Sequence, residues 1–111
     1  PRADIVYSLN PDFTALKDSG VNSVIVTAKS DKKEYDFVSR FFAPALGINE
    51  DPVTGSAHCY LLPYWEERLG SNELNAYQAS KRGGIVRCRH EGNRVFLGGN
   101  AVTVLRGEIY I

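Results

Sequence analysis

The sequence predicts an α+β fold in which mostly antiparallel strands wrap around one central buried helix. Two observations lead to this prediction. Residues 55–69 contain a run of apolar side chains that covers nearly the whole circumference of the first two turns, which is typical of a buried helix. Most of the remaining chain consists of short β-branched or alternating segments separated by turn residues, which is typical of antiparallel strands. With 111 residues, the chain is expected to form a single domain over 1–111.

The composition argues against several classes of protein. Hydrophobic residues make up 43% of the chain, and the formal net charge is zero. These values argue against disorder and against nucleic-acid binding through bulk positive charge. The two cysteines are too few for a disulfide framework, which favours a reduced, cytoplasmic setting. We expect neither a signal peptide nor a membrane contact, because no apolar run is long enough to cross a bilayer.

The N-terminal third is predicted to contain three strands and one short helix. Residues 4–7 are expected to form a strand, and Asn10 followed by Pro11 is a candidate helix start. A short helix should follow until Gly20. The β-branched segment 21–28 and the alternating segment 35–42 are the next two expected strands.

The main helix is expected over residues 55–69. Gly70 is placed to end it, and its second half becomes polar, so that end should reach water. Pro63 removes one backbone hydrogen bond in the middle and should kink the helix or split it.

Strands are predicted for the rest of the chain. Segment 74–79 is one, and segments 84–90 and 94–97 should form a hairpin around residues 91–93. Two more are expected at 101–105 and 108–111. Six basic and two acidic residues lie between positions 80 and 111. The alternation of Arg87 and Arg89 with apolar neighbours favours the polar face of a strand over a nucleic-acid surface.

The loop before the main helix is the strongest candidate for a functional site. The first amide groups of any helix lack intrahelical partners, and together with the helix dipole they attract a carboxylate or a phosphate. Gly55 lets a ligand approach the backbone, while Thr54 and Ser56 can add hydroxyl donors. The carboxylates of Glu50 and Asp51 lie just upstream, where one could move a proton. The simpler alternative is that these residues only cap the helix.

No metal site is predicted. His58 and Cys59 are adjacent on a helix and therefore point about 100° apart. The cluster formed by Cys88 and His90 lacks the two-residue spacer that zinc sites use.

At this loop the sequence resembles the phenazine-biosynthesis PhzF-like family. The specific part of the resemblance is the block from Glu50 to His58, Glu-Asp-Pro-Val-Thr-Gly-Ser-Ala-His. The same order of motifs includes residues 39–44, 62–65 and 78–84, and later Arg94 and Gly98. The resemblance covers most of the chain.

The resemblance implies a fold similar to diaminopimelate epimerase. In that fold two related halves each wrap strands around a helix, and the active site lies between the two helix N-termini. It also implies an isomerase that moves a proton on a small carboxylated substrate, without a metal ion or an organic cofactor.

This chain resembles only the C-terminal half of the family. The principal acid/base glutamate belongs to the N-terminal half, and Glu50 does not correspond to it. What carries over is Asp51 as a substrate-facing carboxylate with a secondary catalytic role. Gly55 and Ser56 carry over as contacts to the anionic group of the substrate, with Thr54 and His58 as supporting members of the substrate-binding set.

If this chain carries only one half of an active site, further expectations follow. The 111 residues would be part of a longer protein and inactive alone, and the open cleft would expose apolar surface. We therefore expect self-association into a homo-oligomer such as a dimer, with the N-terminal half or a second copy of the chain covering that surface. The alternative functions are a non-catalytic binding or interaction module of the same fold and, third, nucleic-acid binding through Arg87 and Arg89.

Overall fold

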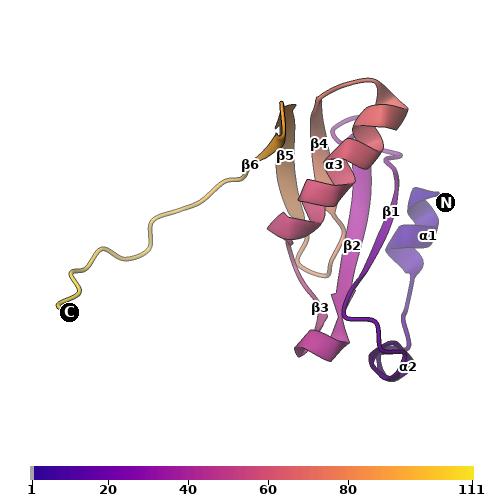
Figure 1. Cartoon of the computed structure of the whole chain (residues 1–111), viewed down its shortest axis with the longest axis horizontal. Coiled ribbons are helices and arrows are strands. Elements are labelled where there is room, and N and C mark those ends of the chain that lie inside the picture. Colours follow the sequence, from indigo (N-terminus) through magenta and orange to yellow (C-terminus); the bar gives the residue numbers. More distant parts are fainter. Residues whose placement is uncertain (1) are drawn as a thin grey trace.

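The computed structural model describes residues 2–111 and contains one mixed sheet with helices on both of its faces (Figure 1). The helices are α1 (Ala3–Ser8), α2 (Phe13–Asp18) and α3 (Gly55–Leu69), with a short 3-10 helix at Pro44–Leu46. The strands are β1 (Val24–Lys29), β2 (Phe37–Ala43), β3 (Ile48–Glu50), β4 (Glu73–Gln78), β5 (Gly84–Glu91) and β6 (Arg94–Gly98). The α+β class predicted from the sequence is confirmed.

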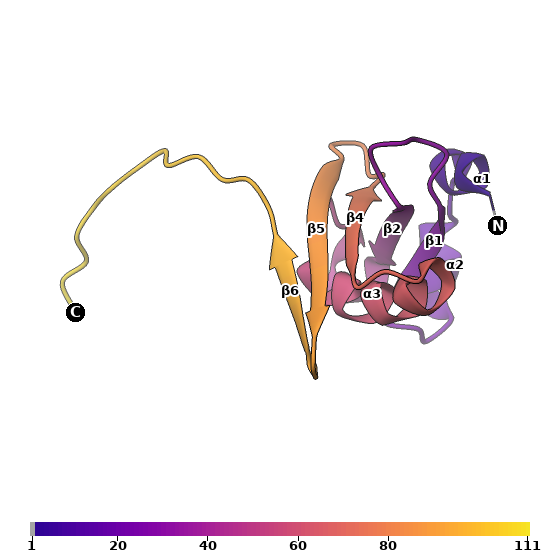
Figure 2. The same ribbon diagram turned by 90° about the horizontal axis from the view of Figure 1, so that it is seen from above.

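The sheet is mostly antiparallel, as predicted. Its main path runs β1-β2-β4-β5-β6, and the short β3 also pairs with β2. Strands β2 and β4 pair in parallel, and α3 lies in the connection between them. Successive residues of β2 are buried on opposite faces: Phe37 packs in the cluster under α3, and Val38 packs in the cluster under α1. The two helices therefore cover opposite faces of the sheet (Figure 2).

Helix α3 begins and ends where the sequence predicts, but it is not buried on all sides. Leu61, Leu62 and Trp65 face the sheet and pack there in the main core. On the other side Tyr60 is 75% exposed. The expected burial around the full circumference is wrong, because the sheet covers one side of the helix only (Figure 1). Pro63 lies within one continuous helix, so it does not split the helix.

The N-terminal strand predicted at residues 4–7 is wrong, because this segment forms α1. Val6 is fully buried against the sheet from this helix. The guanidinium of Arg40 on β2 donates hydrogen bonds to the carbonyls of Val6 (3.1 Å) and Leu9 (2.6 Å) at its C-terminal end. These contacts come from a distant strand and override the strand propensity of the segment. Helix α2 forms as expected, but Asp12 caps it rather than Asn10.

The predicted hairpin is confirmed. Strands β5 and β6 pair antiparallel, and Glu91 lies opposite Arg94, which leaves Gly92 and Asn93 as the turn. Gly92 adopts a positive φ of 57°, a conformation that favours glycine.

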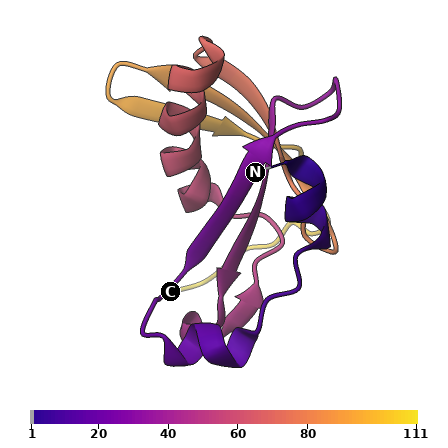
Figure 3. The same ribbon diagram turned by 90° about the vertical axis from the view of Figure 1, so that its right-hand side faces the viewer.

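The two strands predicted at 101–105 and 108–111 do not form. From Gly99 onward the chain has no regular secondary structure and extends away from the sheet (Figures 1 and 2). Figure 3 looks nearly along this segment, which therefore overlaps the domain in that view. Its apolar side chains are almost fully exposed: Val104 is 93% and Tyr110 is 90% exposed. The segment has strand-forming composition but no sheet neighbour within residues 2–111 to supply the backbone partners that a strand requires.

Candidate functional site: the loop at the N-terminus of α3

The candidate site is the loop 51–54, which connects β3 to α3. The amide of Asp51 donates to the carbonyl of Phe41 (3.0 Å), which ties the start of the loop to β2. Further along, the hydroxyl of Ser80 donates to the carbonyl of Pro52 (2.8 Å) and accepts from the amide of Gly83 (3.0 Å). The loop is therefore held by β2 and by the connection between β4 and β5.

Glu50 is a structural residue. Its carboxylate makes a bidentate ion pair with Arg40, with distances of 2.8 and 2.9 Å, and the two side chains are only 19% and 11% exposed. The hydrogen bond to Glu50 raises the pKa of Arg40 above its ordinary value. Because Arg40 also binds carbonyls at the end of α1, the pair joins β3 to the N-terminal helix. Both carboxylate oxygens of Glu50 are thus engaged within the fold.

Asp51 and Thr54 are brought together directly. The hydroxyl of Thr54 donates to Oδ2 of Asp51 (2.5 Å). The side-chain amide of Gln78, on β4, completes the arrangement: its Oε1 accepts from the Thr54 amide (2.7 Å), and its Nε2 donates to the Asp51 carbonyl (2.8 Å). Gln78 is fully buried, so this contact with the loop is shielded from water.

The first turn of α3 has no side-chain cap. Thr54 occupies the N-cap position, but its side chain makes no capping hydrogen bond to the helix. Gly55 and Ser56, the first two helical residues, are exposed. Uncapped amides at the positive end of a helix attract carboxylates and phosphates, and α3 has 15 residues. The Ser56 hydroxyl can add a donor to the same group.

His58 lies on the inner side of the helix. It is fully buried, and its Nδ1 lies 2.6 Å from the carbonyl of Thr54. Because a carbonyl only accepts, Nδ1 carries the proton, and the buried Nε2 has no hydrogen-bond partner among residues 2–111. Burial lowers the pKa of His58, and the hydrogen bond to Thr54 opposes this effect. His58 therefore supports the N-cap residue from within the core.

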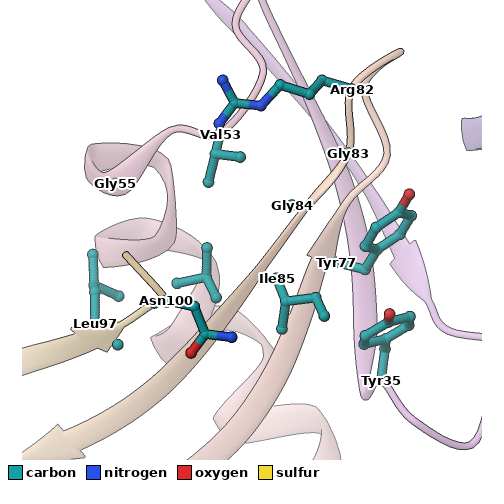
Figure 4. A pocket seen from close by; sticks show the side chains of 13 residues that line it. Tyr35, Val53, Gly55, Tyr77, Arg82, Gly83, Gly84, Ile85, Leu97 and Asn100 are labelled. Atoms are coloured by element: carbon teal, nitrogen blue, oxygen red, sulfur yellow. The ribbon is translucent and has the colours of Figure 1, made fainter. Parts of the chain in front are cut away.

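An open cavity of about 570 Å³ lies beside the start of α3 (Figure 4). Figure 4 shows Val53 and Leu97 on the side of α3, and the stacked rings of Tyr35 and Tyr77 on the opposite side. Of the five site residues predicted from the sequence, all of which the structure describes, this cavity touches only Gly55. The cavity therefore borders the loop at Val53, and Asp51, Thr54, Ser56 and His58 lie outside its lining.

Glycine is needed at one wall of the cavity. A Cβ atom on Gly84 would collide with the side chain of Val53, so the start of β5 lies directly against this loop residue.

Sequence reasoning assigned no role to Gln78, Ser80 or Arg40. A signal for Gln78 was available. It follows Leu74 and Ala76 at two-residue intervals, so it occupies the buried face of a strand, where a polar side chain must find partners. The partners themselves belong to a loop 24 and 27 positions away and could not be read from the strand.

The part of the chain that the structure describes gathers no three His, Cys, Asp or Glu side chains that could hold a metal ion. Within the same residues, no helix has the length and apolar character needed to cross a membrane. Arg87 and Arg89 lie on β5 and make local contacts: Arg87 donates to Asn100 (3.3 Å), and Arg89 pairs with Glu91 (3.2 Å).

The fold and the loop together define a class of protein: a mixed α+β domain in which a structured polar loop directly precedes the main helix. The family follows from comparison. The chain belongs to the PhzC-PhzF family of phenazine biosynthesis-like proteins, whose model matches residues 2–107. This family membership confirms the resemblance on which the sequence interpretation rests.

Relatives in bacteria and animals are similar over four fifths or more of the chain. An uncharacterized isomerase of Halalkalibacterium halodurans is 58% identical, over 93% of this chain and 39% of its own length. A human phenazine biosynthesis-like domain-containing protein is 44% identical, over 80% of this chain and 33% of its own length. A crystal structure of a PhzF-family protein from Enterococcus faecalis superposes with a TM-score of 0.86 at 48% identity, over 100% of this chain and 42% of that one. The chain thus spans about two fifths of the length of such relatives.

Proposed function

We propose that this chain supplies one wall of the active site of a PhzF-like isomerase. The carboxylate of a small substrate binds at the N-terminus of α3, to the amides of Gly55 and Ser56 and to the Ser56 hydroxyl. Asp51 faces the substrate as a secondary acid/base group, and Thr54 and His58 hold the loop. The principal acid/base glutamate lies in the part of the longer relatives that this chain does not span. The reaction is a proton shift that needs no metal ion or organic cofactor.

The observation that carries this proposal is the open first turn of α3. A threonine at the N-cap position ordinarily caps its own helix. Here its hydroxyl instead contacts Asp51 and Gln78. The amides next to it are left for a ligand at a position where Gly55 offers no side-chain obstruction. The name isomerase, which the bacterial relatives carry, supports the choice of reaction class.

The proposal is tested by nuclear magnetic resonance titration of the 111-residue chain with benzoate, a small carboxylate, and with inorganic phosphate. We expect saturable shifts of the Gly55 and Ser56 amides. Gly55→Ala should fold normally, because a Cβ there meets only Leu97 at 3.8 Å, but its methyl group should weaken benzoate binding several-fold. Ser23→Ala is the control: it changes an exposed residue outside the loop and should leave benzoate binding unchanged. Shifts that do not saturate, or that persist unchanged in Gly55→Ala, would contradict the site.

We also propose that the exposed apolar surface formed by Tyr60 and the segment 101–111 is covered in the functional protein. Either the N-terminal half that the longer relatives contain or a second copy of the chain would cover it. Two features support this: Tyr60 on the outer side of α3 is 75% exposed, and the segment 101–111 is extended and apolar. Cys59 and Cys88 are both free, which suits a reduced compartment such as the cytoplasm.

A further inference from the structure

Thr54 stands at the N-cap of α3 without acting as a cap. An N-cap threonine normally accepts a hydrogen bond from the second or third helical amide, here Ser56 or Ala57. In this structure the Thr54 hydroxyl donates to Asp51 Oδ2 (2.5 Å) and accepts from Gln78 Nε2 (3.0 Å). No side-chain cap is made to α3. The hydroxyl is therefore held away from the amides that it would otherwise satisfy.

Gln78 is placed to control this choice. It lies at the end of β4, on the face that packs under α3, and it is fully buried. Both ends of its amide are engaged with the loop: Oε1 accepts from the Thr54 amide, and Nε2 donates to the Asp51 carbonyl as well as to the Thr54 hydroxyl. A buried amide with these partners is fixed in one orientation, because any other orientation leaves polar groups unsatisfied.

We propose that Gln78 is a positioning residue that prevents Thr54 from capping its own helix and so keeps the amide of Ser56, one of the two amides proposed to bind the ligand, free of an internal partner. The benefit of this arrangement to a ligand rests on the proposed function. The claim that Gln78 keeps Thr54 from capping α3 can be tested without any ligand. Asp51 alone does not have this effect. It takes the proton of the Thr54 hydroxyl and leaves both lone pairs of the oxygen free, whereas the hydrogen bond from Gln78 Nε2 takes one lone pair and holds the oxygen in a direction in which it makes no cap to α3.

The ligand-free test measures hydrogen exchange at the Ser56 and Ala57 amides in four proteins: the unchanged chain, Gln78→Leu, Thr54→Val, and the double variant. Gln78→Leu releases the Thr54 hydroxyl to cap the helix. The exchange of at least one of these amides should then slow about five-fold, the factor that corresponds to a cap worth about 1 kcal/mol. The double variant has no hydroxyl to make the cap, so exchange should be fast again. If Gln78 has a purely structural role, exchange should be faster in Gln78→Leu than in the unchanged chain. Adding Thr54→Val should then not return the exchange rate to that of the unchanged chain.

The ligand-dependent test repeats the benzoate titration on the same proteins. Gln78→Leu should bind benzoate about five-fold more weakly, and the double variant should regain affinity. If Gln78→Leu does not fold, as judged by urea denaturation, Gln78→Asn replaces it. That variant keeps a buried amide but is one methylene too short to reach the hydroxyl.

The outcomes separate the two proposals. If the unchanged chain does not bind benzoate but the exchange pattern holds, the proposed function fails and the role of Gln78 stands. If benzoate binds but Ser56 and Ala57 exchange at the same rate with and without Gln78, or remain slow in the double variant, the role of Gln78 is refuted.

Discussion

The ion pair between Arg40 and Glu50 should be among the most important polar contacts for the stability of this domain. We consider the substitution Arg40→Met, which keeps much of the side-chain length and removes the charge. It leaves the Glu50 carboxylate, 19% exposed, without its partner and removes two short hydrogen bonds to carbonyls at the end of α1. Removing one member of a buried pair costs about 3–5 kcal/mol. Because both side chains keep some contact with water, we expect a loss of about 2–4 kcal/mol in the free energy of unfolding.

The chain offers a matched control. Arg2 and Asp4 form an ion pair with the same 2.8 Å separation, but their side chains are 79% and 61% exposed. Water screens a pair that is exposed to this extent, so Arg2→Met should change stability little. The comparison holds the distance constant and varies burial.

Urea denaturation followed by circular dichroism measures both effects, with Arg40→Met/Glu50→Leu as a further variant. Removing both charges should recover part of the loss, because no unpaired carboxylate then remains. If Arg40→Met costs no more than Arg2→Met, or if the double variant is less stable than Arg40→Met, the assignment of Glu50 as a structural residue is incorrect.

Three other predictions concern His58, the segment 101–111 and the basic strand. Burial lowers the pKa of His58 below 6.5, so the unfolded chain takes up a proton that the folded chain does not. Stability should be complete above pH 6.5 and fall below it, by up to about 1.4 kcal/mol per pH unit; an unchanged pH dependence in His58→Gln would refute this. Light scattering should show concentration-dependent self-association that weakens when residues 101–111 are deleted, and a monomer at every concentration would contradict it. Because Arg87 and Arg89 make local contacts, the chain should not bind heparin at physiological ionic strength, and retention lost in Arg87→Ala/Arg89→Ala would reverse that conclusion.

Local signals in the sequence were sufficient for the elements whose ends are determined locally. Helix α3 ends at Gly70, which adopts the positive φ of 73° that its sequence position predicts. The hairpin between β5 and β6 turns at Gly92 for the same kind of reason. Such residues act through their own backbone conformation, so neighbours in the sequence are enough to recognise them. The block from Glu50 to His58 likewise identified the loop that the structure places at the start of α3.

Elements whose stability comes from distant partners could not be predicted in this way. Residues 3–8 have strand-forming composition but become helix α1, because Arg40 and the sheet contact them from far along the chain. Residues 101–111 have the same kind of composition and form no strand, because nothing within the described chain pairs with them. Propensity alone therefore gave the same prediction for two segments with different outcomes.

What the sequence by itself determined is the α+β class, the limits of the main helix and the position of the polar loop, since each depends on residues close together in the chain. Only the tertiary structure decided the roles within the loop. It placed Glu50 in an ion pair, turned His58 into the core and brought Gln78 to Thr54 from β4. The physical reason is that a buried polar group must be satisfied by whichever partner the fold brings within reach, and that partner is set by packing rather than by proximity in the sequence.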